Sequence, residues 1–179
     1  MLHHPEVQVK IFSEIAEVVG LEKAVTMHDK PKLKYTHAAI METQRISISP
    51  LGVPHMSNAD TIISGYTIPA GTTILSSNEF LYRSEENWKN AKHFRPERFL
   101  DAQGNLSVPE HFKPFGLGPR ACPGESIAKM ELFLYLASMI QRFELHPAEP
   151  GQLPSLEPQI GMIYFPQPFQ LRFVERQRV

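Results

Sequence analysis

The sequence predicts a fold that is mainly α with small antiparallel β-sheets (α+β). Apolar residues recur at helical spacing in several stretches, and β-branched residues form short runs between turn formers. The 16 prolines cluster in the connections and near the end of the chain, which indicates much irregular structure between helices. With 179 residues, of which 42% are hydrophobic, the chain is long enough for a real core. We therefore expect residues 1–179 to form a single region.

The helices are predicted from apolar periodicity and from residues that start or stop a helix. Pro5 suits the first turn of a helix, and apolar residues follow at helical spacing until Gly20 ends the element. A second helix is predicted over 31–46 and a short one over 78–82. The long apolar run 127–143 predicts the last helix.

The strands are predicted from β-branched and alternating residues. Runs 61–64 and 72–75 are expected to pair as a small antiparallel sheet, with the turn between them at 66–71. The proline-rich stretch 147–158 predicts a connection. At the end of the chain, apolar residues alternate with polar ones over 169–173, which is typical of a half-buried strand.

Charge and cysteine content exclude several classes of protein. A net charge of -1 without a basic block gives no reason to expect a nucleic-acid partner. A single cysteine excludes an internal disulfide framework. No stretch reaches the roughly 20 apolar residues that a membrane-spanning helix needs. The first residues lack the order of a signal peptide, so the chain is expected to begin in mid-protein.

The single cysteine, Cys122, lies in the run Phe115-Gly-Leu-Gly118-Pro-Arg120-Ala-Cys122-Pro-Gly124, directly before the last predicted helix. A sulfur at a helix N-terminus meets the positive end of the helix dipole and unpaired N–H groups, which favour the metal-binding thiolate. Arg120 adds a positive charge that a bound anion could use. The alternative is a buried cysteine near a helix start, which is what most single cysteines are. The loop alone leaves both interpretations open.

Glu42 and Arg45 are separated by three positions on the second predicted helix, so they share one face and can pair. On the surface such a pair would contribute only a few tenths of a kcal/mol. If the pair is buried, it needs a further partner to satisfy the remaining donors and acceptors.

The Cys122 run resembles the haem-binding loop of cytochromes P-450, whose pattern is F-x-x-G-x-R-x-C-x-G. All specified positions of that pattern match here. Glu42-Thr-Gln-Arg45, Pro96-Glu-Arg98-Phe99 and the Cys122 loop stand in the order and approximate spacing of the last third of a cytochrome P-450. The stretches 50–55 and 65–72 are similar to the animal microsomal, xenobiotic-metabolising branch. The resemblance therefore implies the C-terminal, haem-binding portion of the cytochrome P-450 fold, with the N-terminal part absent.

The resemblance implies a role for each matching residue. Cys122 would be the catalytic, axial thiolate ligand of haem iron, and Arg120 and His55 would hydrogen-bond the haem propionates. Phe115 would pack near the haem and the sulfur, and Gly118 and Gly124 would complete the cofactor-binding loop.

Two further groups of residues follow from the same resemblance. Glu42, Arg45 and Arg98 would form a buried triad that fixes the loop around residue 98 against the helix below it. Arg98 would then be the further partner that a buried Glu42–Arg45 pair needs. By position, the candidate substrate contacts are Leu51, Val53, Met162 and Ile163, for which ordinary core packing is an equal alternative.

The implied activity is that of a haem-thiolate monooxygenase that inserts one oxygen atom of dioxygen into a lipophilic small molecule. It would use haem (iron protoporphyrin IX) and electrons from NADPH through a reductase. The parent protein would be anchored at the endoplasmic reticulum membrane, on its cytoplasmic face. The residues that deliver protons to dioxygen in this family lie upstream of this chain, so the isolated chain is expected to be a poor monooxygenase.

Three alternatives remain open at this point. The chain could be a truncated, non-catalytic isoform that binds haem or acts as a decoy for a partner. It could belong to a family member that rearranges peroxides or dehydrates its substrate without external oxygen. It could also be a structural domain whose cysteine is incidental, which would require the ordered motif matches to be coincidence.

Overall fold

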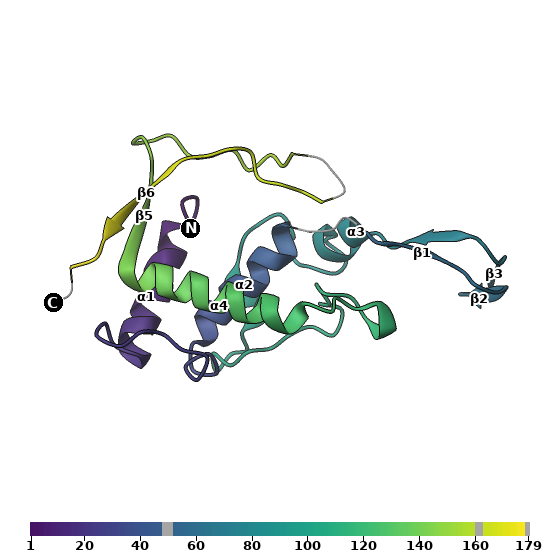
Figure 1. Cartoon of the computed structure of the whole chain (residues 1–179), viewed down its shortest axis with the longest axis horizontal. Helices are drawn as coiled ribbons and strands as arrows, with labels where there is room; N and C mark the ends of the chain where they lie inside the picture. The colour runs from purple at the N-terminus through teal and green to yellow at the C-terminus, as the bar shows by residue number, and fades with distance from the viewer. Residues whose placement is uncertain (48–51, 160–162, 178–179) are drawn as a thin grey trace.

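The computed structural model describes residues 1–47, 52–159 and 163–177 (Figure 1). Its helices are α1 (Pro5–Val18), α2 (Lys34–Ser47), α3 (Asn78–Arg83) and α4 (Glu125–Arg142), with short 3₁₀ helices η1 (Pro96–Phe99) and η2 (Gly118–Arg120). Its strands are β1 (Pro54–Met56), β2 (Thr61–Ile63), β3 (Tyr66–Ile68), β4 (Thr73–Leu75), β5 (Phe143–Pro147) and β6 (Leu171–Glu175). These strands pair as separate two-stranded antiparallel sheets. The predicted mixture of helices and small antiparallel sheets is confirmed.

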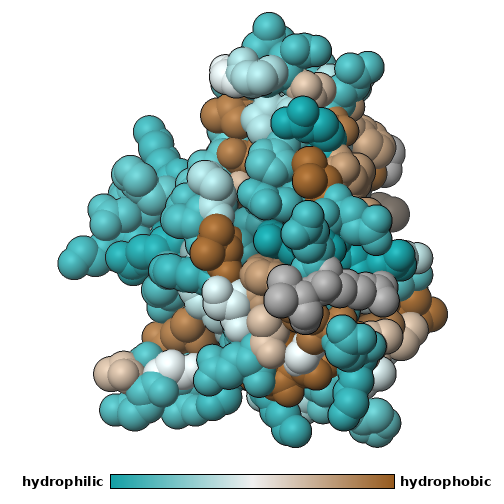
Figure 2. Space-filling view, turned by 90° about the vertical axis from the view of Figure 1, so that its left-hand side faces the viewer, coloured by the Kyte–Doolittle hydropathy of each residue, from teal (hydrophilic) through white to brown (hydrophobic). Residues whose placement is uncertain are grey.

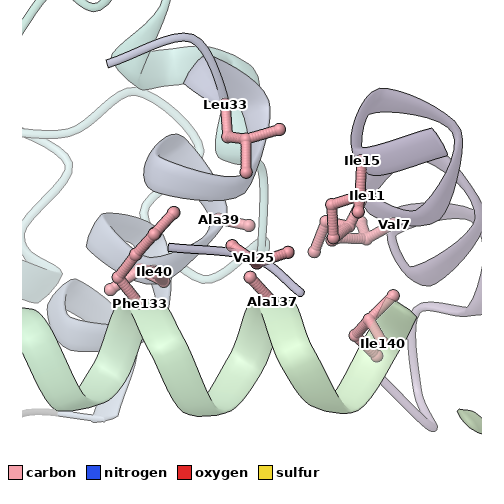
Figure 3. Packing of buried hydrophobic residues seen from close by; sticks show 10 residues of the cluster. All are labelled: Val7, Ile11, Ile15, Val25, Leu33, Ala39, Ile40, Phe133, Ala137 and Ile140. Atoms are coloured by element: carbon pink, nitrogen blue, oxygen red, sulfur yellow. The ribbon is translucent and has the colours of Figure 1, made fainter. Parts of the chain in front are cut away.

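The main hydrophobic core lies where α1, α2 and α4 meet (Figure 3). In the view of Figure 3, Ile11 and Ile15 of α1 lie on the side of Ile140 of α4, whereas Phe133 of α4 lies beside Ile40 of α2. The side chains of Ile11, Ile15, Phe133 and Ile140 are fully buried. The helical spacing of these apolar residues puts them on one face of each helix. Gly20 ends α1 as expected: its backbone has a φ of 85° and its N–H donates to the carbonyl of Ile15.

A second core lies on the other side of α2. Met41 of α2 packs there with Trp88, Phe99 and Phe112, which come from the loop between α3 and η2. Helix α2 therefore lies between two cores, and this explains why even its charged residue Glu42 is fully buried. That position makes α2 the support for the loop that carries η1.

The start of α2 differs from the prediction. The helix begins at Lys34 rather than near Pro31, because a side chain from α1 caps it. The carboxylate of Glu14 accepts hydrogen bonds from the backbone N–H groups of Tyr35 and Thr36 at 2.7 and 2.8 Å. These amides have no partner within the helix, so Glu14 supplies the acceptors that a local cap would supply.

The predicted pairing of 61–64 with 72–75 is wrong. Strand β2 pairs with β3, which was expected to be a turn, and β4 pairs instead with β1. The reason is the dipeptide Ser64–Gly65, whose φ angles of 50° and 85° make a two-residue hairpin turn. The resulting ribbon of β1 to β4 extends away from the helices (Figure 1).

The final sheet pairs the strand that follows the last helix with a strand near the C-terminus. Helix α4 begins at Glu125 and ends at Arg142, and β5 follows at once and pairs with β6. The last strand is thus confirmed, shifted toward the C-terminus relative to 169–173. Seen from this end, the surface is mainly hydrophilic, with apolar side chains in separate small patches (Figure 2). Among the described helices, none is both long and apolar enough to cross a membrane.

Candidate functional site

The loop around Cys122 is shaped by backbone hydrogen bonds and glycines. The N–H of Cys122 donates to the carbonyl of Phe115 at 2.8 Å, which closes the loop between them. Gly116 and Gly118 have φ angles of 80° and 70°, in the left-handed region that favours glycine. Gly124 directly precedes α4, so the sulfur lies just before the N-terminal end of that helix. A residue with a side chain would be strained at either left-handed position.

The side chain of Cys122 is exposed and lines a cavity of about 650 Å³. Arg120 and Phe115 line the same cavity from the same loop, and His55 reaches it from β1. The structure therefore brings together four residues that the sequence predicted as one site. The alternative of a buried cysteine is wrong for this chain.

Arg120 and His55 are free to bind a ligand at this cavity. Within residues 1–47, 52–159 and 163–177, neither side chain has a hydrogen bond or an ion pair to the protein. Both can donate hydrogen bonds, and a guanidinium matches a carboxylate in geometry and charge. The cavity thus has an accessible sulfur and two uncommitted polar groups that suit an anionic ligand.

The glycines at 118 and 124 differ in what they contribute. A Cβ at Gly118 would meet no atom within 4 Å, so glycine is required there for its backbone conformation rather than for space. A Cβ at Gly124 would lie 3.9 Å from Sγ of Cys122, which is ordinary van der Waals contact. Gly116, which the motif did not specify, also has a left-handed backbone conformation that favours glycine. In the sequence, nothing but the residue type indicates this conformation.

Glu42 and Arg45 form a fully buried ion pair on α2. Arg45 donates from Nε and Nη2 to the two carboxylate oxygens of Glu42, at 2.8 and 2.9 Å. Its remaining donors reach backbone carbonyls, those of Tyr82 at 2.6 Å and Ala91 at 2.8 Å. The guanidinium therefore has the further partners that a buried charge needs.

Arg98 of η1 completes this cluster. Its Nε lies 2.9 Å from Glu42, and its other nitrogens donate to the carbonyls of Lys89, Asn90 and His93. The N–H of Arg95 also donates to Glu42 at 2.8 Å. The structure thus brings Glu42, Arg45 and Arg98 together and fixes the chain from Lys89 to Arg98 over α2.

Two aromatic residues of this cluster were missed from the sequence. The guanidinium carbons of Arg45 and Arg98 lie 5.4 and 5.9 Å from the ring centre of Trp88, within the range of cation–π attraction. Tyr82 is buried, and its backbone carbonyl accepts a hydrogen bond from Nη1 of Arg45. The single tryptophan of the chain was a usable signal for Trp88, whereas nothing in the sequence singles out Tyr82.

The candidate substrate residues have mixed outcomes. Val53 is exposed and lines the 650 Å³ cavity, which argues against core packing for this residue. Ile163 is exposed and does not contribute to the described lining of that cavity. Leu51 and Met162 lie outside the described residues. Sequence reasoning also missed the uncharged polar residues of the lining, which are Gln44, Ser47, Ser76 and Asn78.

A smaller cavity of about 280 Å³ shares Phe115 and Gly116 with the lining of this site. It is lined by His37 of α2 and by lysines from neighbouring segments, Lys30, Lys113 and Lys129. Burial, and next to it the positive charges of Lys30 and Lys129, lower the pKa of His37 from 6.5 to about 4. His37 is therefore neutral at pH 7.

The fold and the site define a helix-rich protein whose accessible thiol faces a cavity suited to an anionic group. Residues 1–173 match the family model described as Cytochrome P450. The chain is 42% identical over 174 residues to Cytochrome P450 2U1 of Homo sapiens, which covers 97% of this chain and 32% of that protein. It is also 42% identical over 172 residues to Cytochrome P450 2D15 of Canis lupus familiaris, covering 96% of this chain and 34% of that protein.

The chain belongs to the cytochrome P450 family. The predicted resemblance is thereby confirmed, as is its direction toward animal members of the family. The chain spans about a third of the length of the curated relatives it matches.

Proposed function

We propose that this chain is the C-terminal, haem-binding portion of a haem-thiolate monooxygenase that inserts one oxygen atom of dioxygen into a lipophilic small molecule. The observation that carries the proposal is the joint exposure of Cys122, Arg120 and His55 to one cavity. Membership of the cytochrome P450 family supports the choice of haem as the ligand.

The residues around the cavity fit a haem group. A volume of about 650 Å³ lies within the range of small-molecule and cofactor sites, and Phe115 and Leu117 supply apolar surface. Arg120 and His55, which have no partner among the described residues, would bind the propionates. Cys122 is the only sulfur ligand in the chain that could bind iron as a thiolate.

Each residue of the loop has a defined task in this proposal. The hydrogen bond from Cys122 N–H to Phe115 holds the loop closed, and the left-handed Gly118 turns the chain toward Cys122. Cys122 lies just before the start of α4, where the positive end of the helix dipole attracts a bound anion. Haem bound through a thiolate supplies the chemistry that cleaves the O–O bond of dioxygen.

The finer parts of the activity rest on family membership. Val53 is the substrate contact best supported, because it is exposed at the cavity, and Leu51, Met162 and Ile163 remain proposed by position. We further propose that electrons come from NADPH through a reductase. We place the complete protein at the cytoplasmic face of the endoplasmic reticulum membrane.

The proposal is tested by the optical spectrum of the haem-reconstituted protein. The experiment uses two proteins. One is the 179-residue chain, and the other is a longer polypeptide in which this chain is extended to the length of its relatives. Each is reduced and exposed to carbon monoxide, and the Soret band is recorded for wild type and Cys122→Ser. A strongly red-shifted band that disappears in the variant supports thiolate ligation.

The matched control is Ala121→Ser, which adds a hydroxyl beside the site and keeps the sulfur. It should retain the red-shifted band. Identical spectra for wild type and Cys122→Ser would contradict the proposal. If the wild-type longer polypeptide forms a hydroxylated product and its Cys122→Ser variant, which lacks the red-shifted band, forms none, the chain belongs to a monooxygenase and not to a non-catalytic haem-binding isoform.

A further inference from the structure

Tyr82 joins the buried Glu42–Arg45–Arg98 cluster to the loop that carries Cys122. We propose that Tyr82 is a positioning residue for Cys122, holding the start of the cysteine loop at a fixed place relative to the ion-pair cluster. The inference rests on the proposed function, because it concerns how the thiolate ligand is presented to its cavity. Tyr82 matches no position of the cysteine-loop pattern or of the two charged motifs.

The backbone of Tyr82 is fixed by the ion-pair cluster. Its carbonyl accepts a hydrogen bond from Nη1 of Arg45 at 2.6 Å. Arg45 is itself fully buried and fixed by two bonds to Glu42. The backbone of Tyr82 in the last turn of α3 is therefore held by a buried guanidinium that is itself bound to a buried carboxylate.

The side chain of Tyr82 reaches the other partner. Its hydroxyl oxygen accepts a hydrogen bond from the backbone N–H of Lys113 at 3.2 Å. The carbonyl of Lys113 in turn accepts from Gly116 at 2.9 Å, and the carbonyl of Phe115 accepts from Cys122 at 2.8 Å. Consecutive hydrogen bonds thus lead from Tyr82 along the loop to the cysteine.

Packing makes this hydroxyl a precise anchor. Tyr82 is 4% exposed, and its ring meets the ring of Phe112 edge to face with centres 6.0 Å apart. Burial raises the pKa of Tyr82 above its ordinary value, so the side chain stays a neutral phenol at physiological pH. Phenylalanine would retain the ring contacts at this position and would lack only the hydrogen-bond acceptor.

The first test compares Tyr82→Phe with Tyr135→Phe by hydrogen exchange on the 179-residue chain. Tyr135 is 68% exposed, so its hydroxyl is a matched control on α4. Loss of the acceptor should speed exchange of the Lys113 amide by about tenfold. The thermal unfolding midpoint of Tyr82→Phe should stay close to that of the control, because the ring packing is kept. Unchanged exchange at Lys113 would overturn the inference.

The second test reads out the position of the sulfur. In the haem-reconstituted longer polypeptide, Tyr82→Phe should lower the fraction of the carbon monoxide complex with the red-shifted Soret band, while Tyr135→Phe should not. If the wild type shows the red-shifted band and Tyr82→Phe shows it in the same fraction of its carbon monoxide complex, the positioning role is overturned. A wild type without the band would instead contradict the proposed function, so the two failures are distinguishable.

Discussion

The carboxylate of Glu42 lies 2.9 Å from Nε of Arg98, although the two residues are 56 positions apart in the sequence. Glu42 is fully buried on α2, and Arg98 is held in η1 at the end of a long irregular loop. Their pairing therefore fixes a segment with little regular structure of its own to α2, half of whose described residues are buried.

Replacing Arg98 by alanine should destabilise the protein by about 3 kcal/mol, because Glu42 loses one of its two buried cationic partners. Haem retention should fall as well, since the loop over α2 is released. Lys129→Ala is the control, because the Lys129–Glu125 pair on α4 is exposed and such pairs contribute at most about 1 kcal/mol. Chemical unfolding and haem titration of both variants check this prediction. Equal haem retention would contradict a role for the cluster.

Replacing Arg120 by alanine should weaken haem binding by about tenfold, the loss expected for one charge-assisted hydrogen bond to a propionate. The stability of the protein without haem should not change, because Arg120 has no partner in the part of the chain that the structure describes. Arg142→Ala at the exposed end of α4 serves as the control. The measurement is a haem titration together with thermal unfolding. If Arg142→Ala weakened binding as much, the propionate assignment would be wrong.

Replacing Phe133 by alanine should destabilise the protein by about 4 kcal/mol, because a fully buried ring between α2 and α4 is lost. Leu132→Ala is the matched control on the same helix, since Leu132 is 41% exposed. Its effect should be much smaller. Urea unfolding of both variants distinguishes a core residue from its exposed neighbour, and similar losses would contradict the assigned core.

Acid should destabilise the protein through His37. Its pKa is 6.5 when unfolded and about 4 when folded, so the unfolded state binds a proton first as the pH falls. This loss of stability should begin near pH 6.5 and continue down to about pH 4. His37→Gln should flatten the pH dependence in that window, whereas the exposed His28→Gln should not. Unfolding midpoints measured across this range provide the test. An unchanged slope in His37→Gln would contradict the assignment.

The sequence predicted best what depends on local pattern. The apolar periodicity of α1 and α4 and the stop at Gly20 reflect interactions within a few residues, so their positions could be predicted closely. The β2–β3 hairpin was missed because Pro69 and Gly71 are more conspicuous turn formers than Ser64–Gly65. The start of α2 was misplaced because its cap is Glu14, a side chain from another helix.

The candidate site was predicted where residue types carry the chemistry. Cys122, Arg120 and the Glu42–Arg45 pair are recognisable because the chain has a single cysteine and because the charged residues stand at specific spacings. The carbonyl partners of Arg45 and Arg98 have no signature, since every residue has a carbonyl group. The role of Tyr82 depends on a hydroxyl meeting a distant amide, which only the folded chain brings together.

The exposure of Cys122 also makes its thiol accessible to oxidation by dissolved oxygen. As the sole thiol of the chain, it cannot form an internal disulfide, so oxidation would link two copies covalently or produce a sulfenic acid. A reducing agent is therefore needed during purification to prevent disulfide-linked dimers. The same property permits a fluorophore to be attached at this one position without altering any other residue.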